Sequence, residues 1–371
     1  MNVPFLDLAK THSEIEGEVN SSISSFLSKG TYILGDEVER FEQDWARYCE
    51  AEYCVGVASG LDALLLALKS LEIGEGDEVI VPNNTFIATW LAVTQAGAIP
   101  VGVEPEIGTY CISPSGIISA ITERTKAIIA VHLYGHPCDM DEVMAIAEEA
   151  NCFVIEDAAQ AHGAEYQGRK IGAHGHITAW SFYPGKNLGA YGDAGAITTA
   201  NIELANKIRL LRNYGSSRKY YNEITGYNSR MDGLQAAILN VKLKYLAKWG
   251  NQRSKLATTY MNQLSDCSFK LPGTHLYVKH AWHLFVIRVC DREKLYRYLL
   301  EAGIQTMVHY PIPPYRQKAY MCSEDSFILR STSCITDSIS DTVLSLPIGP
   351  HMDDNQQSYV IDKLRHYDRQ H

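Results

Sequence analysis

The sequence predicts an α/β protein, in which a mostly parallel sheet lies between helices and a smaller α+β domain follows. Short apolar runs that read as strands alternate with amphipathic helical periods up to about residue 200. Strands that are apolar along both faces belong in a sheet that is covered on both sides, as parallel sheets are. After about residue 200 long helical periods dominate, which indicates a change of architecture.

The elements of the first part are expected in regular alternation. A helix near 13–28 leads to a short strand that ends at Ala58 and runs directly into an apolar helix. Two further strand-like runs flank Lys186 within 178–199. The other strands are expected within 76–83, 98–104, 125–135 and 152–160, and the other helices within 85–97 and 139–151.

The second part reads as long helices followed by a small domain. One helical period covers 201–215, and another at 231–264 is long enough for two helices that meet near Gly250. A strand within 283–289 and helices within 292–304 and 353–367 follow. We therefore predict a large domain over 1–250, including the N-terminal segment, and a small C-terminal domain over 251–371.

Composition narrows the possible functions. The net charge of −10, without a basic run, argues against binding to nucleic acid or to an anionic membrane surface. Nine scattered cysteines without a Cys-x-x-Cys pair indicate reduced core residues rather than a disulfide framework or a metal site. The N-terminal segment lacks the pattern of a signal peptide and no run of 18 apolar residues occurs, so we expect a cytoplasmic protein.

A first candidate binding element lies where a strand turns into a helix. Ser59 can cap the helix that begins at Gly60, which leaves the amides of Gly60 and Leu61 free to face an anion. An ordinary capped helix without a ligand explains the same residues.

Two further candidate elements carry charged side chains at strand ends. Glu156 and Asp157 stand at the carboxyl end of an apolar strand, which is where ligands of open α/β sheets bind. One carboxylate points to each face of the sheet. Asp157 could instead cap a following helix. Lys186 stands on a Pro-Gly turn whose nearby glycines allow close backbone approach to a ligand, although a solvated surface lysine is the alternative.

Four motifs together resemble a known family. Ser59-Gly60 is followed by EDAAQAHGA at 156–164, SFYPGKN at 181–187 and GYNSRMDGLQAAIL at 226–239. This order and spacing is similar to that of the DegT/StrS family of pyridoxal phosphate (PLP)-dependent sugar-nucleotide aminotransferases, and the likeness covers nearly the whole chain. It implies the aspartate aminotransferase-like fold type I, whose large domain holds a mostly parallel seven-stranded sheet.

The resemblance implies specific roles around the cofactor ring. Lys186 would form a Schiff base with PLP and move the substrate proton, with pyridoxamine phosphate as the intermediate form of the cofactor. Asp157 would hold the proton on the pyridine nitrogen, and Gln160 would reach the phenolic oxygen. Phe86 would lie against the ring face, with Trp90 as the second choice for that contact and otherwise a core aromatic.

The same resemblance implies a phosphate site shared between two subunits. The phosphate would lie at the start of the helix that Ser59 caps and would be bound by the amides of Gly60 and Leu61 and the hydroxyl of Ser181. Asn228 would come from the partner of a homodimer. Family members usually carry threonine where this chain has Leu61. The backbone amide is kept, but the side-chain hydroxyl is lost, so phosphate affinity would depend more on Ser181 and Asn228.

The substrate that the resemblance implies is a nucleotide-linked, probably dTDP-linked, keto-6-deoxyhexose, with glutamate as the amino donor. FYPGKNLGAYGDAG, with HLYGH at 132–136, is most similar to enzymes that aminate a 3-keto sugar for glycan or antibiotic biosynthesis. Enzymes for 4-keto sugars tend to carry a histidine near the Tyr183 position and a Thr-Gly-Glu-Gly run after the lysine. Six residues are candidates for the sugar pocket, although each could instead be a core residue: His162, Tyr183, Tyr214, Tyr221, His309 and Tyr310. Four cations are candidates for binding the diphosphate, although their loop could instead be an ordinary solvated one: Arg212, Arg218, Lys219 and Arg230.

Three other classes explain the sequence less well. A nucleotide-binding dehydrogenase would need a Gly-x-Gly-x-x-Gly run after the first strand, which VGVASGLDA does not supply. A sugar dehydratase of the same family would carry a histidine in place of Lys186. A non-catalytic regulator on this fold would have no need to keep Asp157, Gln160, Ser181 and Lys186 together.

Overall fold

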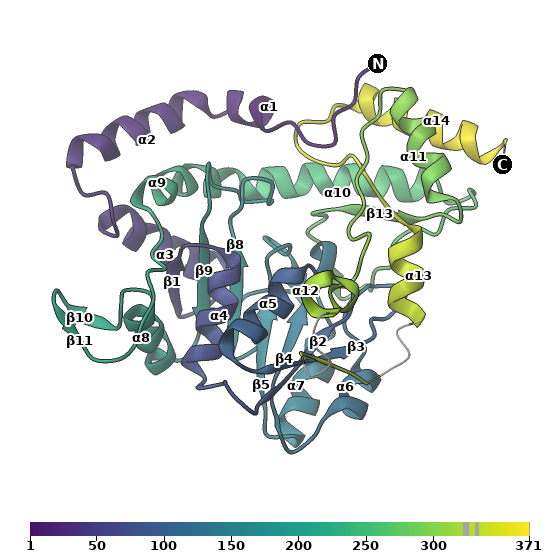
Figure 1. The fold of residues 1–371 in the computed structure, drawn as a ribbon. Coiled ribbons are helices and arrows are strands. Elements are labelled where there is room, and N and C mark those ends of the chain that lie inside the picture. Colours follow the sequence, from purple (N-terminus) through teal and green to yellow (C-terminus); the bar gives the residue numbers. More distant parts are fainter. Residues whose placement is uncertain (322–325, 331–333, 371) are drawn as a thin grey trace.

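The computed structural model describes residues 1–321, 326–330 and 334–370, and its large sheet lies at the centre of the molecule (Figure 1). The strand order is β1-β9-β8-β5-β4-β2-β3-β14. β9 pairs antiparallel with β1 and β8, and all other neighbours are parallel. The strands are β1 (Tyr53–Val57), β9 (Gly195–Thr199), β8 (Ile177–Ser181), β5 (Phe153–Asp157), β4 (Thr125–Val131), β2 (Glu78–Pro82), β3 (Ile99–Val103) and β14 (Ile328–Leu329).

Helices cover both faces of this sheet, as the apolar strands predict. Ile80 belongs to one buried core, while its neighbours Val79 and Val81 belong to the other, because successive side chains of a strand point to opposite faces. The first core lies under α3 (Asp36–Tyr48), α6 (Pro114–Ala120), α7 (Met140–Glu149) and α9 (Gly233–Lys242). The second lies under α4 (Gly60–Ser70), α5 (Ile87–Ala96) and α8 (Ile202–Leu211).

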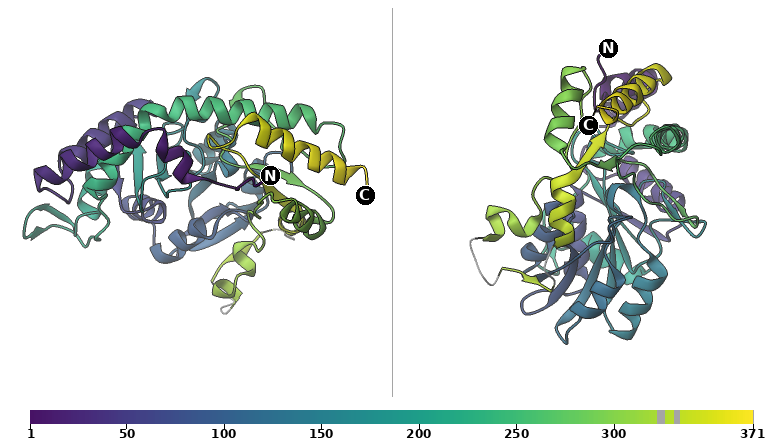
Figure 2. Two further views of the ribbon diagram at one scale, coloured as in Figure 1. Left: turned by 90° about the horizontal axis from the view of Figure 1, so that it is seen from above. Right: turned by 90° about the vertical axis from the view of Figure 1, so that its right-hand side faces the viewer.

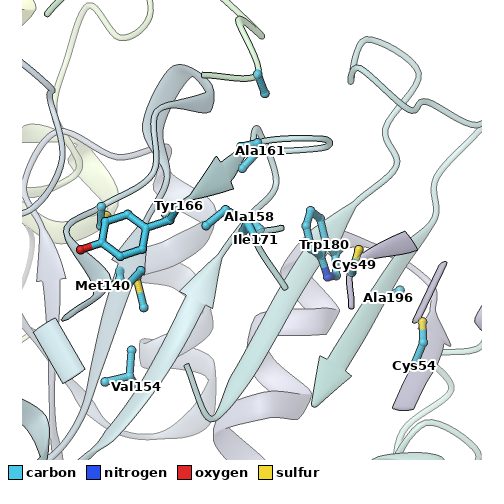
Figure 3. Packing of buried hydrophobic residues seen from close by; sticks show 14 of the residues in the cluster. Cys49, Cys54, Met140, Val154, Ala158, Ala161, Tyr166, Ile171, Trp180 and Ala196 are labelled. Atoms are coloured by element: carbon cyan, nitrogen blue, oxygen red, sulfur yellow. The ribbon is translucent and has the colours of Figure 1, made fainter. Parts of the chain in front are cut away.

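The first core is rich in aromatic and sulfur-containing side chains. Trp180 of β8 packs edge to face against Trp45 of α3, with ring centroids 4.9 Å apart. Figure 3 shows Cys49, which follows α3, close to Trp180, and Cys54 nearby on β1. Five cysteines are buried as expected, but Cys267 is only partly buried and Cys290 and Cys334 are exposed, so the expectation that all are core residues is wrong. Cys322 lies outside the described residues.

The N-terminal helices and the long helical period pack together along the top of the molecule in Figure 1. α1 (Leu8–Ser13) and α2 (Glu16–Lys29) precede α3, and Ile15 and Val19 share a small core with Ile238 of α9 and Trp249 of α10 (Leu246–Gln263). The predicted junction near Gly250 is wrong. Gly250 lies inside α10, and the break between α9 and α10 is a 3-10 turn, Leu243–Tyr245.

A third core joins the C-terminal half of α10 to the last part of the chain. Leu256, Phe285 and Leu364 are among its buried residues, and Val3 of the N-terminal segment also belongs to it. Figure 2 shows α10, α11 and α14 on the same side of the molecule, with both chain ends close to them. A boundary between residues 250 and 251 stays a prediction. The elements here are β13 (Phe285–Arg288), α11 (Arg292–Glu301), α12 (Lys318–Met321), α13 (Cys334–Thr342), β15 (Val343–Leu346) and α14 (Asp354–Asp368).

Two details of the sheets differ from the expectations. Seven strands form the body of the large sheet, and the two-residue β14 adds an eighth next to β3. Small sheets are formed by β10 (Ser216–Arg218) with β11 (Tyr221–Asn222), by β12 (Val278–Lys279) with β6 (Glu165–Tyr166) and β7 (Arg169–Lys170), and by β13 with β15.

Within the described residues, no helix is long and apolar enough to cross a membrane.

One candidate cation turns out to stabilise the large domain. Arg212, which follows α8, is buried and donates through Nη1 to Glu42 of α3 and, at 2.6 Å, to the carbonyl of Gly56 in β1. Glu42 also accepts from the Gly56 amide at 2.8 Å. Because Arg212 is buried in this pair and does not line the cavity, the prediction that it binds diphosphate is wrong.

Arg212→Met should lower the free energy of unfolding by about 3 kcal/mol or more, because it leaves the buried Glu42 carboxylate without its cation. Urea denaturation followed by circular dichroism measures this. The control is Arg47→Met, which removes the exposed pair with Asp44 and should change stability by less than about 1 kcal/mol. Equal effects of the two substitutions would show that the buried pair contributes no more to the free energy of unfolding than the exposed pair does.

Candidate active site

A cavity of about 730 Å³ opens at the carboxyl ends of the parallel strands. This is the place where open α/β sheets bind ligands. Many residues singled out from the sequence line it. They are Ser59, Gly60, Leu61, Phe86, Asp157, Gln160, Ser181, Tyr183, Lys186, His309 and Tyr310.

Lys186 enters the cavity from the turn after β8. Its amide donates to the Tyr183 carbonyl at 2.8 Å, which closes the Pro-Gly turn. The pKa of Lys186 is lowered to about 8 because surrounding protein removes water from the ammonium group, and the Asp157 carboxylate opposes this shift only in part. Lys186 is therefore not a solvated surface lysine, and a large share of its amine is neutral near pH 8.

Asp157 ends β5 on the same side of the sheet as α4 and α5. Its carboxylate is buried and accepts from the Thr89 hydroxyl at 2.9 Å and the Ala159 amide at 3.2 Å. Burial raises the pKa of Asp157, while these two hydrogen bonds and the Lys186 charge act in the opposite direction. Turns rather than a helix follow β5, so Asp157 does not serve as a helix cap.

The N-terminus of α4 faces the cavity beside the end of β8. Ser59 caps this helix, since its Oγ accepts from the Asp62 amide at 3.1 Å. The first intrahelical donor is the Ala63 amide, so the amides of Gly60 and Leu61 remain available to an anion. A Cβ on Gly60 would lie 2.5 Å from the Cβ of Ser181, which explains why glycine brings the helix this close to the strand.

The other ring-facing candidates form one connected group. Gln160 accepts from the Tyr134 amide at 2.5 Å and donates to the Tyr310 hydroxyl at 3.0 Å. The Phe86 ring, about half exposed, lies 5.4 Å from the Tyr310 ring and lines the cavity. Trp90 is fully buried among aromatic rings and bonds to the Pro82 carbonyl, so it is a core residue.

His309 and Tyr310 reach the cavity from the segment between α11 and α12. The Nδ1 atom of His309 lies 2.8 Å from the hydroxyl of Ser345 in β15. Burial, together with the nearby Lys186 charge, lowers the pKa of His309 to about 4, so its imidazole is neutral. Tyr183 lines the same cavity with its ring more than half exposed, next to the Lys186 turn.

Several predicted residues do not line this cavity. His162 is buried between Trp45, Trp180 and Phe182, with both ring nitrogens unpaired, so the prediction that it binds substrate is wrong. Burial lowers the pKa of His162 to about 3 and keeps it neutral. The others lie outside the lining of the cavity, on the exposed β10-β11 hairpin or beside it: Tyr214, Arg218, Lys219, Tyr221, Asn228 and Arg230.

Three residues that sequence reasoning missed contribute to the site. Thr89 donates to Asp157, His283 lies beside the Lys186 charge, and Arg253 lines the cavity from α10. Arg253 donates to the carbonyls of Trp282, His283 and Ile348 at 3.1–3.2 Å, and none of the ion pairs among the described residues involves it. Of these three residues, only Thr89 had a feature in the sequence that could have pointed to the site, namely its position one turn into a helix that follows a strand.

These groups fit pyridoxal phosphate. A neutral amine at Lys186 can bond to an aldehyde carbon, a buried carboxylate at Asp157 can hold a proton on a ring nitrogen, and the start of α4 can bind a phosphate. Among the described residues no cluster of His, Cys, Asp or Glu could hold a metal ion. The arrangement can support amino-group transfer.

Comparison with known proteins agrees with this geometry. The model of the DegT/DnrJ/EryC1/StrS aminotransferase family matches residues 13–365. The chain is 48% identical over 366 residues to the erythromycin biosynthesis sensory transduction protein EryC1 of Saccharopolyspora erythraea. The matched residues cover 98% of this chain and 99% of the relative. The chain is 49% identical, with the same coverage, to the dTDP-3-amino-3,6-dideoxy-alpha-D-galactopyranose transaminase of Aneurinibacillus thermoaerophilus.

Solved structures extend the likeness to three dimensions. The crystal structure of S. venezuelae DesV in complex with a ketimine intermediate superposes with a TM-score of 0.96 at 47% identity, covering 99% of this chain and 98% of that one. NtdA from Bacillus subtilis, with bound pyridoxamine phosphate, gives 0.90 at 36% identity, covering 99% and 85%. The fold type I architecture of a pyridoxal phosphate aminotransferase is therefore confirmed.

The rate of covalent attachment of pyridoxal phosphate to the apoprotein should increase with pH and reach half its maximum near pH 8, because only the neutral Lys186 amine reacts. Borohydride trapping at timed intervals measures this rate, and Lys186→Ala should give no trapped adduct. Asp157→Asn removes the charge that raises the pKa of Lys186, so its midpoint should move to lower pH. A midpoint at the ordinary lysine value of about 10.4 would contradict the burial argument.

Proposed function

We propose, from the premise that this chain belongs to the DegT/DnrJ/EryC1/StrS aminotransferase family, that it transfers an amino group from glutamate to a nucleotide-linked 3-keto-6-deoxyhexose. The product would be a 3-amino-3,6-dideoxyhexose nucleotide. The observation that carries the proposal is the meeting of Lys186 and Asp157 in one cavity that the N-terminus of α4 also lines. Pyridoxal phosphate supplies the electron sink for the reaction.

Each half of the reaction moves a proton through Lys186. With pyridoxal phosphate and an amino acid bound, the Nζ atom of Lys186 would take the proton from the amino-acid carbon that carries the amino group and would return it to the cofactor carbon bonded to that nitrogen. The lowered pKa of Lys186 suits both steps near neutral pH, since the amine can gain and lose a proton at little cost. The Asp157 carboxylate, which Thr89 and Ala159 hold in place, would supply the negative charge that keeps a proton on the ring nitrogen.

The phosphate would lie at the start of α4, with a second subunit completing the site. Gly60, Leu61 and Ser181 line this end of the cavity. Asn228 lies outside the cavity of its own subunit and is exposed, which fits a role in the partner's site. The exposed Tyr214 and Tyr221 rings near it and the cations Arg218 and Lys219 fit a surface that meets the partner and the sugar-nucleotide diphosphate.

The 3-keto assignment is supported by relatives and by the walls of the cavity. The transaminase from A. thermoaerophilus carries the 3-amino group in the name of its dTDP-sugar. Tyr183, His309 and Tyr310 line the cavity together with Lys186 and would turn the hexose so that carbon 3 faces the amine. The amino sugar that the enzyme makes would be used for glycans, such as lipopolysaccharide O-antigen or S-layer glycan, or for antibiotics. The expected cytoplasmic location stays a prediction.

Arg253 supports an amino acid carrying a carboxylate as the donor. It is 4% exposed, and burial lowers the pKa of its guanidinium to about 10, with no carboxylate acting against this shift. A buried cation without an anion is costly, and a bound carboxylate would remove the cost. Because Arg253 lines the cavity together with Lys186, we assign it to the donor carboxylate.

The purified enzyme, given pyridoxal phosphate and glutamate, should aminate a dTDP-linked 3-keto-6-deoxyhexose and leave the 4-keto isomer unchanged until a ketoisomerase has moved the carbonyl. Mass spectrometry and NMR of the product decide the position of the amino group. A 4-amino product formed directly from the 4-keto sugar at a comparable rate would replace the 3-keto proposal by a 4-keto one. No amino product from either sugar would contradict the aminotransferase proposal itself.

Arg253→Met should raise the KM for glutamate on the order of 100-fold, because the donor carboxylate loses its buried cation. The second half-reaction, started from the pyridoxamine phosphate form with keto-sugar, should change far less. Arg292→Met is the matched control, since Arg292 also donates to a backbone carbonyl but lies outside the cavity. An equal loss in both half-reactions would mean that Arg253 only supports the fold.

A further inference from the structure

We infer that Glu156 and His132 form a buried clamp that positions Asp157 and Gln160 toward the cofactor, an inference that rests on the proposed function. Both side chains are fully buried, and neither lines the cavity. Glu156 is the residue next to Asp157 on β5, and its side chain points to the opposite face of the sheet. His132 follows β4, the strand next to β5.

The hydrogen bonds of His132 show which of its ring nitrogens faces Glu156 as a donor. Its Nδ1 atom accepts from the Cys138 amide at 3.0 Å, so the ring proton of the neutral imidazole lies on Nε2. Nε2 is 3.0 Å from the Oε2 atom of Glu156 and therefore donates to it. His132 thus joins the 132–138 segment to the side chain of Glu156.

The other oxygen of Glu156 is surrounded by donors. Oε1 accepts from the amides of His174 at 3.1 Å and Gly175 at 2.8 Å, and from the Thr178 hydroxyl at 2.8 Å. With Nε2 of His132 facing Oε2, no partner remains to accept a proton from a neutral carboxyl group. Glu156 is therefore ionised. Burial acts to raise its pKa, but the contacts with His132 and the Gly175 amide outweigh burial and lower it.

The clamp is connected to both residues that would face the cofactor ring. The backbone amide of His132 donates to the Asp157 carbonyl at 3.1 Å, while its side chain holds Glu156. Two residues further on, the Tyr134 amide donates to the Oε1 atom of Gln160 at 2.5 Å. A shift of His132 would therefore move Asp157 through the backbone and Gln160 through Tyr134.

Glu156→Gln tests this role without changing the size of the side chain. The Gln amide presents donors on one side, and every partner of Glu156 is itself a donor, so one close contact becomes two facing donors. The 132–138 segment must then move. The matched control is Glu42→Gln, which makes the same change at another buried glutamate that accepts from a backbone amide and a second side chain, but at a distance from the cavity.

The readout is the ¹⁵N NMR shift of the ring nitrogen in holoenzyme loaded with ¹⁵N-labelled pyridoxal phosphate, together with the Kd of the cofactor. Glu156→Gln should move the shift toward that of Asp157→Asn and raise the Kd on the order of tenfold, as supporting residues of a site do. Thr178→Val, which removes one donor without adding another, should move both in the same direction by less. Glu42→Gln should keep the wild-type shift even where it lowers the melting temperature.

A wild-type ¹⁵N shift and Kd in both folded Glu156→Gln and Thr178→Val would overturn the clamp. If Glu156→Gln does not fold, Thr178→Val alone decides between the two results. Failure of the proposed function would look different, because wild-type protein with bound cofactor would then form no amino product from either keto-sugar. The two ideas therefore fail in separate measurements.

Discussion

Lys186 and Asp157 share a cavity that removes water from both, and loss of water disfavours the charged form of each. Their mutual attraction offsets only part of this cost, so the pKa of Lys186 is lowered and that of Asp157 is raised. An amine that is largely neutral suits bond formation and proton transfer, whereas the carboxylate has to stay charged to hold a ring proton. Thr89 and Ala159 donate hydrogen bonds to the carboxylate alone and thereby favour its charged form. Desolvation by itself would favour the neutral form of both groups.

The sheet provides the geometry for this pair. β5 and β8 are parallel neighbours, so Asp157 and the turn that carries Lys186 emerge at the same edge. α4 starts at that edge as well, and it comes close because Gly60 and Gly195 have no Cβ to collide with Ser181 and Ser59. The phosphate end of the site therefore depends on close backbone approach, while the reactive end depends on charge.

Much of the fold and of this half of the site could be predicted from the sequence, because its signals are local. Strand ends, a capped helix and a lysine on a Pro-Gly turn are each visible within about ten residues. Predictions failed where burial decides. Arg212 and His162 carry chemistry typical of binding residues, yet both are enclosed by the core, and nothing in their own segments distinguishes that from a ligand contact. The junction near Gly250 failed because the helix tolerates that glycine and breaks instead at Leu243–Tyr245.

The part of the wall that holds Arg253, His283, His309 and Tyr310 has a different origin, and this explains why sequence reasoning missed Arg253 and His283. Arg253 comes from α10, His283 from the residues before β13, and His309 and Tyr310 from the segment after α11. They meet through long-range packing: Arg253 holds the carbonyls of His283 and Ile348, and Tyr134 holds the carbonyl of His309. The cofactor half of the site is thus encoded in short motifs, whereas the half that would choose the sugar and the amino donor is assembled from distant segments. Substitutions in the third core could therefore change substrate choice without touching Lys186 or Asp157.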